Sequence, residues 1–141
     1  MKIKIRIPSY EISVPYEKVK FKYIEEIVLG VLKEIGKKVM RDVIAVVDEI
    51  EFKGHEKGLE STGKKGSSKY IETVFGIIPC IRRRYKDKIN GGYRYLTDEK
   101  LGLHKKATES PGKVKRQIEA AVESRSYRQA SKEEDPFRTL L

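Results

Sequence analysis

One stretch of this chain, from about residue 16 to residue 52, repeats apolar side chains every three or four residues. This spacing is typical of one face of an amphipathic helix. The face consists of Ile24, Val28, Val31, Leu32, Ile35, Val39, Val43, Val46 and Ile50, widened by Leu29, Ile44 and Val47. The side expected to face water carries Glu25, Lys33, Lys37, Lys38, Arg41 and Asp48. The remainder of the chain has to fold around this helix.

The expected length of this helix is large for the size of the chain. A continuous helix of ~30 residues would be ~45 Å long, whereas a compact domain of this size has a radius of gyration of about 14 Å. The helix is therefore expected to overhang its own domain. Either it kinks near Gly30 or Gly36, or its exposed end packs on a partner, which predicts a homo-oligomer formed through the long helix.

Residues Met1–Ile7 alternate strictly between charged and apolar side chains. A period of two predicts a half-buried strand, which ends at Pro8. Ile12 and Val14 are expected to form a second short strand.

Two runs of β-forming residues, Tyr70–Phe75 and Ile77–Tyr85, flank Gly76 and predict a tight antiparallel hairpin. Pro79 should lie at an edge or a bulge, because it has no backbone N–H to donate. A turn at residues 90–92 leads to a third predicted strand, Tyr93–Leu96, and residues 97–102 are expected to form a capped turn that closes the sheet.

Residues 63–68 superficially resemble a phosphate-binding loop but lack its spacing, so we expect no nucleotide site there.

The C-terminal region is expected to be helical. Ser110 can cap a helix that begins at Pro111, and its buried side would carry Val114, Ile118, Ala121 and Val122. A break at residues 125–127 and a second short helix to Ala130 are compatible with a partial helix-turn-helix, though also with other arrangements. The tail from Lys132 onward has no apolar stripe and is expected to be frayed.

Together these elements predict an α+β fold: N-terminal strands, one long amphipathic helix, a small antiparallel sheet and C-terminal helices. We divide the chain into residues 1–57, 58–109 and 110–141.

The single cysteine, Cys80, excludes an internal disulfide and is expected to be a buried, inert thiol. With no signal peptide and no apolar stretch able to span a bilayer, a cytoplasmic protein with no membrane partner is predicted.

The charge of the chain favours a polyanionic partner. Its 31 Lys and Arg residues outnumber 21 Asp and Glu residues, which gives a net charge of +10. Basic side chains that meet phosphates release counterions, and this release drives association with nucleic acid. The alternative is a solvated basic surface with no specific ligand.

The densest basic cluster predicts where a nucleic acid would bind. The candidate binding residues are Arg82, Arg83, Arg84, Tyr85, Lys86, Lys88, Arg94, Lys105 and Lys106. On a strand, Arg82 and Arg84 would share one face and straddle successive phosphates, while Tyr85, Tyr93 and Tyr95 would add hydroxyl donors or stacking planes. The alternative is an edge strand that charge keeps soluble.

No pattern predicts catalysis, a metal site or a cofactor. Asp98 and Glu99 are adjacent, so their side chains would point apart on a strand. His55 and His104 lie in separate loops without ligand spacing, and the acidic residues 133–135 are typical of a solvated tail.

Four ordered blocks resemble a known family. They are Thr73–Gly76 (T-x-F-G), Arg82–Asp87 (R-R-x-Y-x-D), Gly92–Leu103 (G-x-Y-x-Y-L-x-D-E-x-L-G and the following leucine) and Ser126–Ala130 (S-Y-R-x-A). Together with the preceding long helix, they are similar to uncharacterised protein family 0236, whose members are the ISLre-type insertion-sequence transposases of low-GC Gram-positive bacteria.

The resemblance implies a DNA-binding or assembly region. Members of that family run several times further and are thought to carry a downstream RNase H-like domain with acidic metal ligands. No residue here matches that catalytic set, so the resemblance implies a truncated, non-catalytic N-terminal part of a transposase that binds duplex DNA through its basic hairpin. The alternatives are an RNA- or ribosome-associated basic protein and a helix-mediated interaction module.

Overall fold

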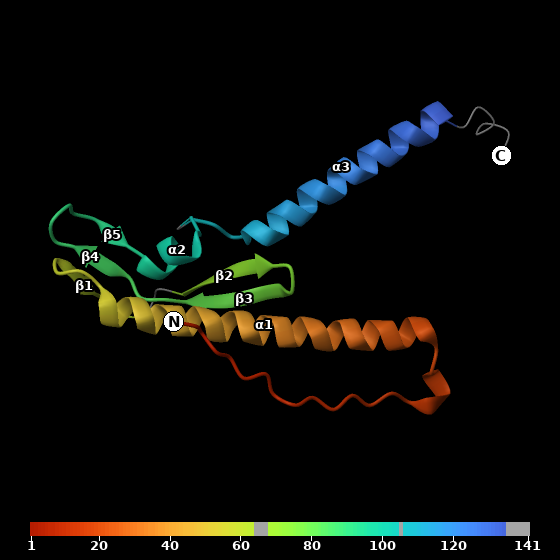
Figure 1. The fold of residues 1–141 in the computed structure, drawn as a ribbon, viewed down its shortest axis with the longest axis horizontal. Helices are drawn as coiled ribbons and strands as arrows, with labels where there is room; N and C mark the ends of the chain where they lie inside the picture. Colours follow the sequence, from red (N-terminus) through yellow and green to blue (C-terminus); the bar gives the residue numbers. More distant parts are fainter. Residues whose placement is uncertain (64–67, 105, 135–141) are drawn as a thin grey trace.

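The computed structural model describes residues 1–63, 68–104 and 106–134, with residues 126–134 described by their backbone alone. The elements in chain order are η1, a 3-10 turn (Tyr16–Lys18), α1 (Phe21–Gly54), β1 (Leu59–Ser61), β2 (Ser68–Thr73), β3 (Gly76–Ile81), β4 (Tyr85–Asp87), β5 (Tyr93–Arg94), α2 (Leu96–Leu101) and α3 (Pro111–Glu134). The predicted α+β class is confirmed: a long helix, small antiparallel sheets and C-terminal helices (Figure 1).

The long helix α1 runs without a break, so the kink expected at Gly30 or Gly36 is absent (Figure 1). Its C-terminal half carries the buried residues Ile44 and Val47. Its N-terminal half extends past the sheets (Figure 1) and leaves Leu32 55% exposed. The overhang expected from its length is therefore present, while association through it stays a prediction.

The predicted hairpin around Gly76 is β2 paired with β3, with Thr73 opposite Gly76. Gly76 has a φ of 122°, which favours glycine, and the Thr73 hydroxyl bridges the turn by donating to the Gly76 carbonyl and accepting from the Phe75 N–H. Pro79 lies opposite Tyr70 on β3, whose only described strand partner is β2, so it sits at an edge as predicted.

The second run does not continue as one strand to Tyr85. β3 ends at Ile81, and β4 belongs to a separate three-stranded sheet with the order β1–β4–β5. The hydrophobic core lies between α1 and the inner face of the hairpin. It contains Ile44, Ile71, Ile78 and Cys80, with Met40, Leu101 and Leu103 packed against it. The Cys80 side chain is buried, as predicted, and its burial raises the pKa of the thiol.

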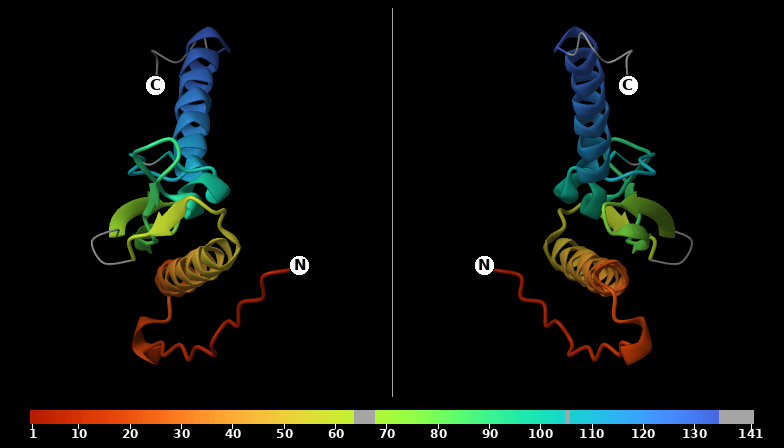
Figure 2. Two further views of the ribbon diagram at one scale, coloured as in Figure 1. Left: turned by 90° about the vertical axis from the view of Figure 1, so that its left-hand side faces the viewer. Right: turned by 90° about the vertical axis from the view of Figure 1, so that its right-hand side faces the viewer.

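The predicted N-terminal strands are wrong. Residues 1–14 have no strand assignment, and Ile7 is 58% exposed. Figures 1 and 2 show the reason: this segment runs back along the opposite side of α1 from the sheets. Its alternating pattern therefore meets no strand edge with which it could form a ladder.

The predicted break in the C-terminal helix is also wrong. α3 begins at Pro111, and the Ser110 hydroxyl caps it by accepting the Lys113 N–H at 3.1 Å, as predicted. The helix then runs through residues 125–127 to Glu134, because none of these residues is a glycine or proline that would interrupt its backbone bonding. The predicted closing turn at residues 97–102 is instead formed by α2, which ends at Leu101 and is followed by Gly102 with a left-handed φ of 70°. The tail was expected to be frayed from Lys132 onward, but residues 132–134 belong to α3, and residues 135–141 lie outside the described residues.

Gly36 permits close packing between α1 and the hairpin. A Cβ on Gly36 would lie 2.4 Å from Cδ1 and 2.5 Å from Cγ of the Phe75 ring, at the β2–β3 turn. A Cβ on Gly30 would meet no atom within 4 Å. Gly30 and Gly36 therefore differ in their packing.

We expect Gly30→Ala and Gly36→Ala to shift stability in opposite directions. Gly30→Ala should raise the free energy of unfolding by roughly 0.5–1 kcal/mol through helix propensity. Gly36→Ala should lower it by about 1–3 kcal/mol, because the Phe75 ring has to move. Urea denaturation of both variants measures this, and equal stabilisation by both would contradict the packing role of Gly36.

Candidate nucleic-acid interface

The segment of residues 82–84 links β3 to β4 and is not itself part of a strand. Arg82 is 4% exposed. Its Nε lies 3.2 Å from Oδ1 of Asp98 in α2, and its guanidinium lies 4.0 Å from the centroid of the Tyr95 ring. Lys69 approaches the other oxygen of the same carboxylate at 3.2 Å. Arg82 is therefore held inside the protein and is not presented to a ligand.

Arg83 is bound to α1. Its Nη1 donates to Asp48 Oδ2 at 2.8 Å, its backbone N–H donates to Asp48 Oδ1 at 2.8 Å, and its Nη2 donates to Glu49 Oε1 at 2.7 Å. The Thr97 hydroxyl also donates to Asp48 Oδ1, and the Arg83 guanidinium lies over Phe52. Asp48 is fully buried, so the expectation that it faces water is wrong: these donors replace its hydration.

The exposed row of guanidinium groups that the sequence predicted is therefore not present. Of the three arginines, Arg84 lies nearest the surface. Its guanidinium lies 4.1 Å from the centroid of the exposed Tyr93 ring, and its Nε donates to Thr62 Oγ1 at 3.4 Å. Replacing all three arginines together would break two buried ion pairs and would test folding rather than binding.

The outer face of the β1–β4–β5 sheet carries the remaining basic side chains of this region. Tyr85 points inward and is fully buried, so the neighbouring Lys86 points outward and is exposed. Tyr93 and Glu60 lie opposite Lys86 on the flanking strands. No acidic side chain in the described ranges forms an ion pair with Arg84 or Lys86. We call Arg84, Lys86 and Tyr93 the basic–aromatic face.

The other predicted residues are spread more widely. Lys88 pairs with Glu60 at 3.1 Å, and Arg94 pairs with Glu99 at 2.9 Å. Lys106 is exposed, on the connection between α2 and α3. Lys105 lies outside the described residues. The structure therefore does not gather the predicted set into one surface.

Within the described ranges, no group of three or more His, Cys, Asp or Glu side chains is arranged to hold a metal ion. His55 stacks on Phe52, and His104 accepts the Lys106 N–H at 3.2 Å. No helix in the described part of the chain combines the length and apolar character needed to cross a bilayer.

A family model described as an uncharacterised protein family, UPF0236, matches residues 15–138. The chain belongs to this family. The family suggested by the four sequence blocks is thus confirmed. No curated protein and no solved structure matches the chain.

In this UPF0236 chain, the second and third sequence blocks pack against each other. Arg82 of the R-R-x-Y-x-D block pairs with Asp98 of the Y-x-Y-L-x-D-E block, and the tyrosines of that block lie beneath Arg82 and Arg84. Much of the block pattern is therefore explained by internal contacts. Sequence reasoning missed the burial of Asp48. The one indication in the sequence is its position next to Ile44 and Val47, at the border of the apolar face of α1.

Asp87, the last residue of the R-R-x-Y-x-D block, organises the turn between β4 and β5. Its Oδ1 accepts the backbone N–H groups of Asn90 at 2.9 Å and Ile89 at 3.0 Å. The backbone hydrogen bond from Asn90 is the main cause that lowers the pKa of the Asp87 carboxyl. The charged carboxylate therefore stabilises this turn.

We expect Asp98→Asn to destabilise the fold strongly. The substitution keeps the side-chain volume but removes the negative charge next to the buried Arg82 guanidinium, a change that costs about 3–5 kcal/mol. The matched control is Glu99→Gln, which removes the exposed Arg94 pair and should cost less than about 1 kcal/mol. Chemical denaturation measures both, and similar costs would contradict the structural role of Asp98.

Asp87→Asn should remove a pH-dependent part of the stability. Because the folded pKa of Asp87 is lowered, the stabilisation is present above the unfolded pKa of about 3.9 and is lost as the pH falls through the folded value. The difference in unfolding free energy between the parent chain and Asp87→Asn should therefore be full at neutral pH and shrink in acid. A difference that stays constant as the pH falls would count against this role.

Proposed function

We propose that this chain is a transposase-related module that binds duplex DNA and acts through binding rather than catalysis. The observation that carries the proposal is the basic–aromatic face, where Lys86 and Arg84 lie beside an exposed tyrosine ring. The net charge of +10 supports it, because such a surplus raises the affinity for any polyphosphate. The likeness of the sequence blocks to insertion-sequence transposases supports the choice of DNA.

The chemistry of this face fits a backbone contact better than the reading of bases. Arg84 and Lys86 offer charged donors to phosphate oxygens, and such contacts carry no sequence information directly. The Tyr93 ring holds the Arg84 guanidinium from below, which orders a side chain that would otherwise sample many rotamers. The proposed activity is therefore sequence-tolerant and strongly dependent on salt.

We expect Arg84→Ala/Lys86→Ala to weaken duplex binding and to reduce its salt dependence. If each side chain neutralises one phosphate, the slope of log K against log salt should fall by about 1.8. The control is Lys22→Ala/Lys33→Ala, which removes the same charge from the N-terminal half of α1, at the far end of α1 from the β1–β4–β5 sheet (Figure 1). Fluorescence anisotropy with labelled duplex across a salt series measures both.

Three outcomes would contradict the proposal. Affinity of the parent chain that does not fall with salt would exclude phosphate contacts. Equal losses of duplex affinity in the two double variants would show that binding does not depend on the basic–aromatic face. Tighter binding to structured RNA than to duplex DNA, in competition at one salt concentration, would favour an RNA-associated protein instead.

A further inference from the structure

The helix α3 projects away from the rest of the described structure (Figures 1 and 2). Its anchorage lies at its start: the Ser110 N–H donates to the Glu72 carbonyl at 2.9 Å, and Lys113 forms an ion pair with the Glu72 side chain. Beyond its first turns, the described side chains of α3 are exposed. Helices in proteins derive most of their stability from the packing of an apolar face, whereas the described side chains of α3 beyond its first turns gain little such packing.

The exposed side chains of α3 include an apolar stripe. Val114 is 39% exposed, and Ile118 and Val122 are each 59% exposed. With about 100° per residue, these three residues lie within about 40° of one line along the helix. Ala121 and Arg125 fall on the same side. An exposed stripe of this kind is the usual form of a helix–helix contact.

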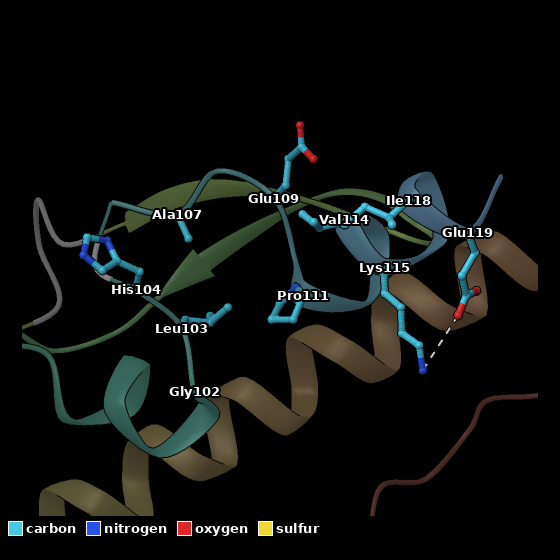
Figure 3. Close-up of a pocket in the computed structure, with 10 residues that line it drawn as sticks. All are labelled: Gly102, Leu103, His104, Ala107, Glu109, Pro111, Val114, Lys115, Ile118 and Glu119. Carbon is cyan, nitrogen blue, oxygen red and sulfur yellow. Dashed lines mark ion pairs between the residues drawn. The ribbon is translucent and has the colours of Figure 1, made fainter. Parts of the chain in front are cut away.

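The stripe leads into a groove at the base of α3. The groove has a volume of about 680 Å³ and is bordered by Leu103, Ala107 and Pro111 together with Val114 and Ile118 of the stripe. Figure 3 shows Glu109 and the Lys115–Glu119 pair at its polar borders. The floor is apolar, and charges of both signs lie along the borders.

We propose that the stripe and groove of α3 bind the α3 helix of a second copy of this chain in an antiparallel pair. The two-fold axis would pass at Ile118, so that Ile118 meets the partner's Ile118 and Val114 meets the partner's Val122. Residues 122–125 of each helix then lie level with the groove at the base of the other. The stripe and the groove of each copy both contact the other copy, as two-fold symmetry requires.

Charge complementarity favours a second copy of this chain as the partner and an antiparallel arrangement of the two α3 helices. In the antiparallel pair, Lys115 lies within about 3 Å along the axis of the partner's Glu119. Arg125 lies level with the start of the partner's helix, where Glu109 borders the groove. A parallel pair would instead place Arg125, which lies close to the stripe, beside its own copy, and like charges so placed are destabilising.

Disulfide trapping tests the symmetry axis directly. Ile118→Cys should form a covalent dimer on mild oxidation, because a two-fold axis at this residue brings its two copies within disulfide distance. Ala120→Cys, on the opposite side of α3, is the matched control and should stay uncrosslinked. Cys80 is fully buried and provides a low background. Ile118 is largely exposed, so its replacement leaves the fold intact.

Charge exchange provides a second test on the full chain without nucleic acid. The parent chain should show twice the monomer mass by light scattering. Lys115→Glu should shift the equilibrium toward monomer, and Lys115→Glu combined with Glu119→Lys should restore the dimer.

A parent chain that is monomeric at every concentration would overturn the proposal. So would a dimer in which Ile118→Cys does not crosslink while Leu32→Glu in α1 dissociates it, because that dimer forms through the overhang of α1. Neither result contradicts DNA contact through the basic–aromatic face, which the duplex titration of Arg84→Ala/Lys86→Ala tests separately.

Discussion

Two buried carboxylates hold the described fold together. Asp48 of α1 binds Arg83, and Asp98 of α2 binds Arg82, so adjacent residues of one connecting segment are tied to two different helices. Thr97 also donates to Asp48, which links α2 directly to α1. A buried charge is tolerated only when its hydrogen bonds are replaced, so the partners fix one arrangement of α1, α2 and the β3–β4 connection. The sheets are positioned relative to α1 through the same connection.

This arrangement determines how much of the basic sequence is available to a ligand. Consecutive residues in extended backbone point in different directions, so three adjacent arginines cannot share one surface. Arg82 and Arg83 turn toward acidic partners inside, and Arg84 lies against Tyr93. Each of the three guanidinium groups lies over a different aromatic ring, which orders it without neutralising it. The net positive charge is thus no measure of the size of a phosphate-binding surface.

The elements that depend on local pattern could be predicted from the sequence, and those that depend on long-range pairing could not. The period of α1, the hairpin at Gly76, and the Ser110 cap with Pro111 follow from spacing and turn chemistry, and the structure has them. The alternation in residues 1–7 gave a false strand, because a strand also needs a neighbouring edge, and α1 separates this segment from the sheets. Asp48 was misplaced for a similar reason: a carboxylate on the border of an apolar face is buried only when a distant arginine reaches it.

The small size of the basic–aromatic face bears on how such a chain would hold DNA. Two cationic side chains release few counterions, so one copy is expected to bind weakly at physiological salt. An antiparallel α3 pair would present this face twice, and the second contact would then form at the effective concentration set by the first. That gain requires both faces to reach the same duplex, whereas α3 pairing itself does not require DNA. Because linkage between two binding equilibria is reciprocal, a dimer that binds the duplex more tightly would in turn be favoured by the duplex.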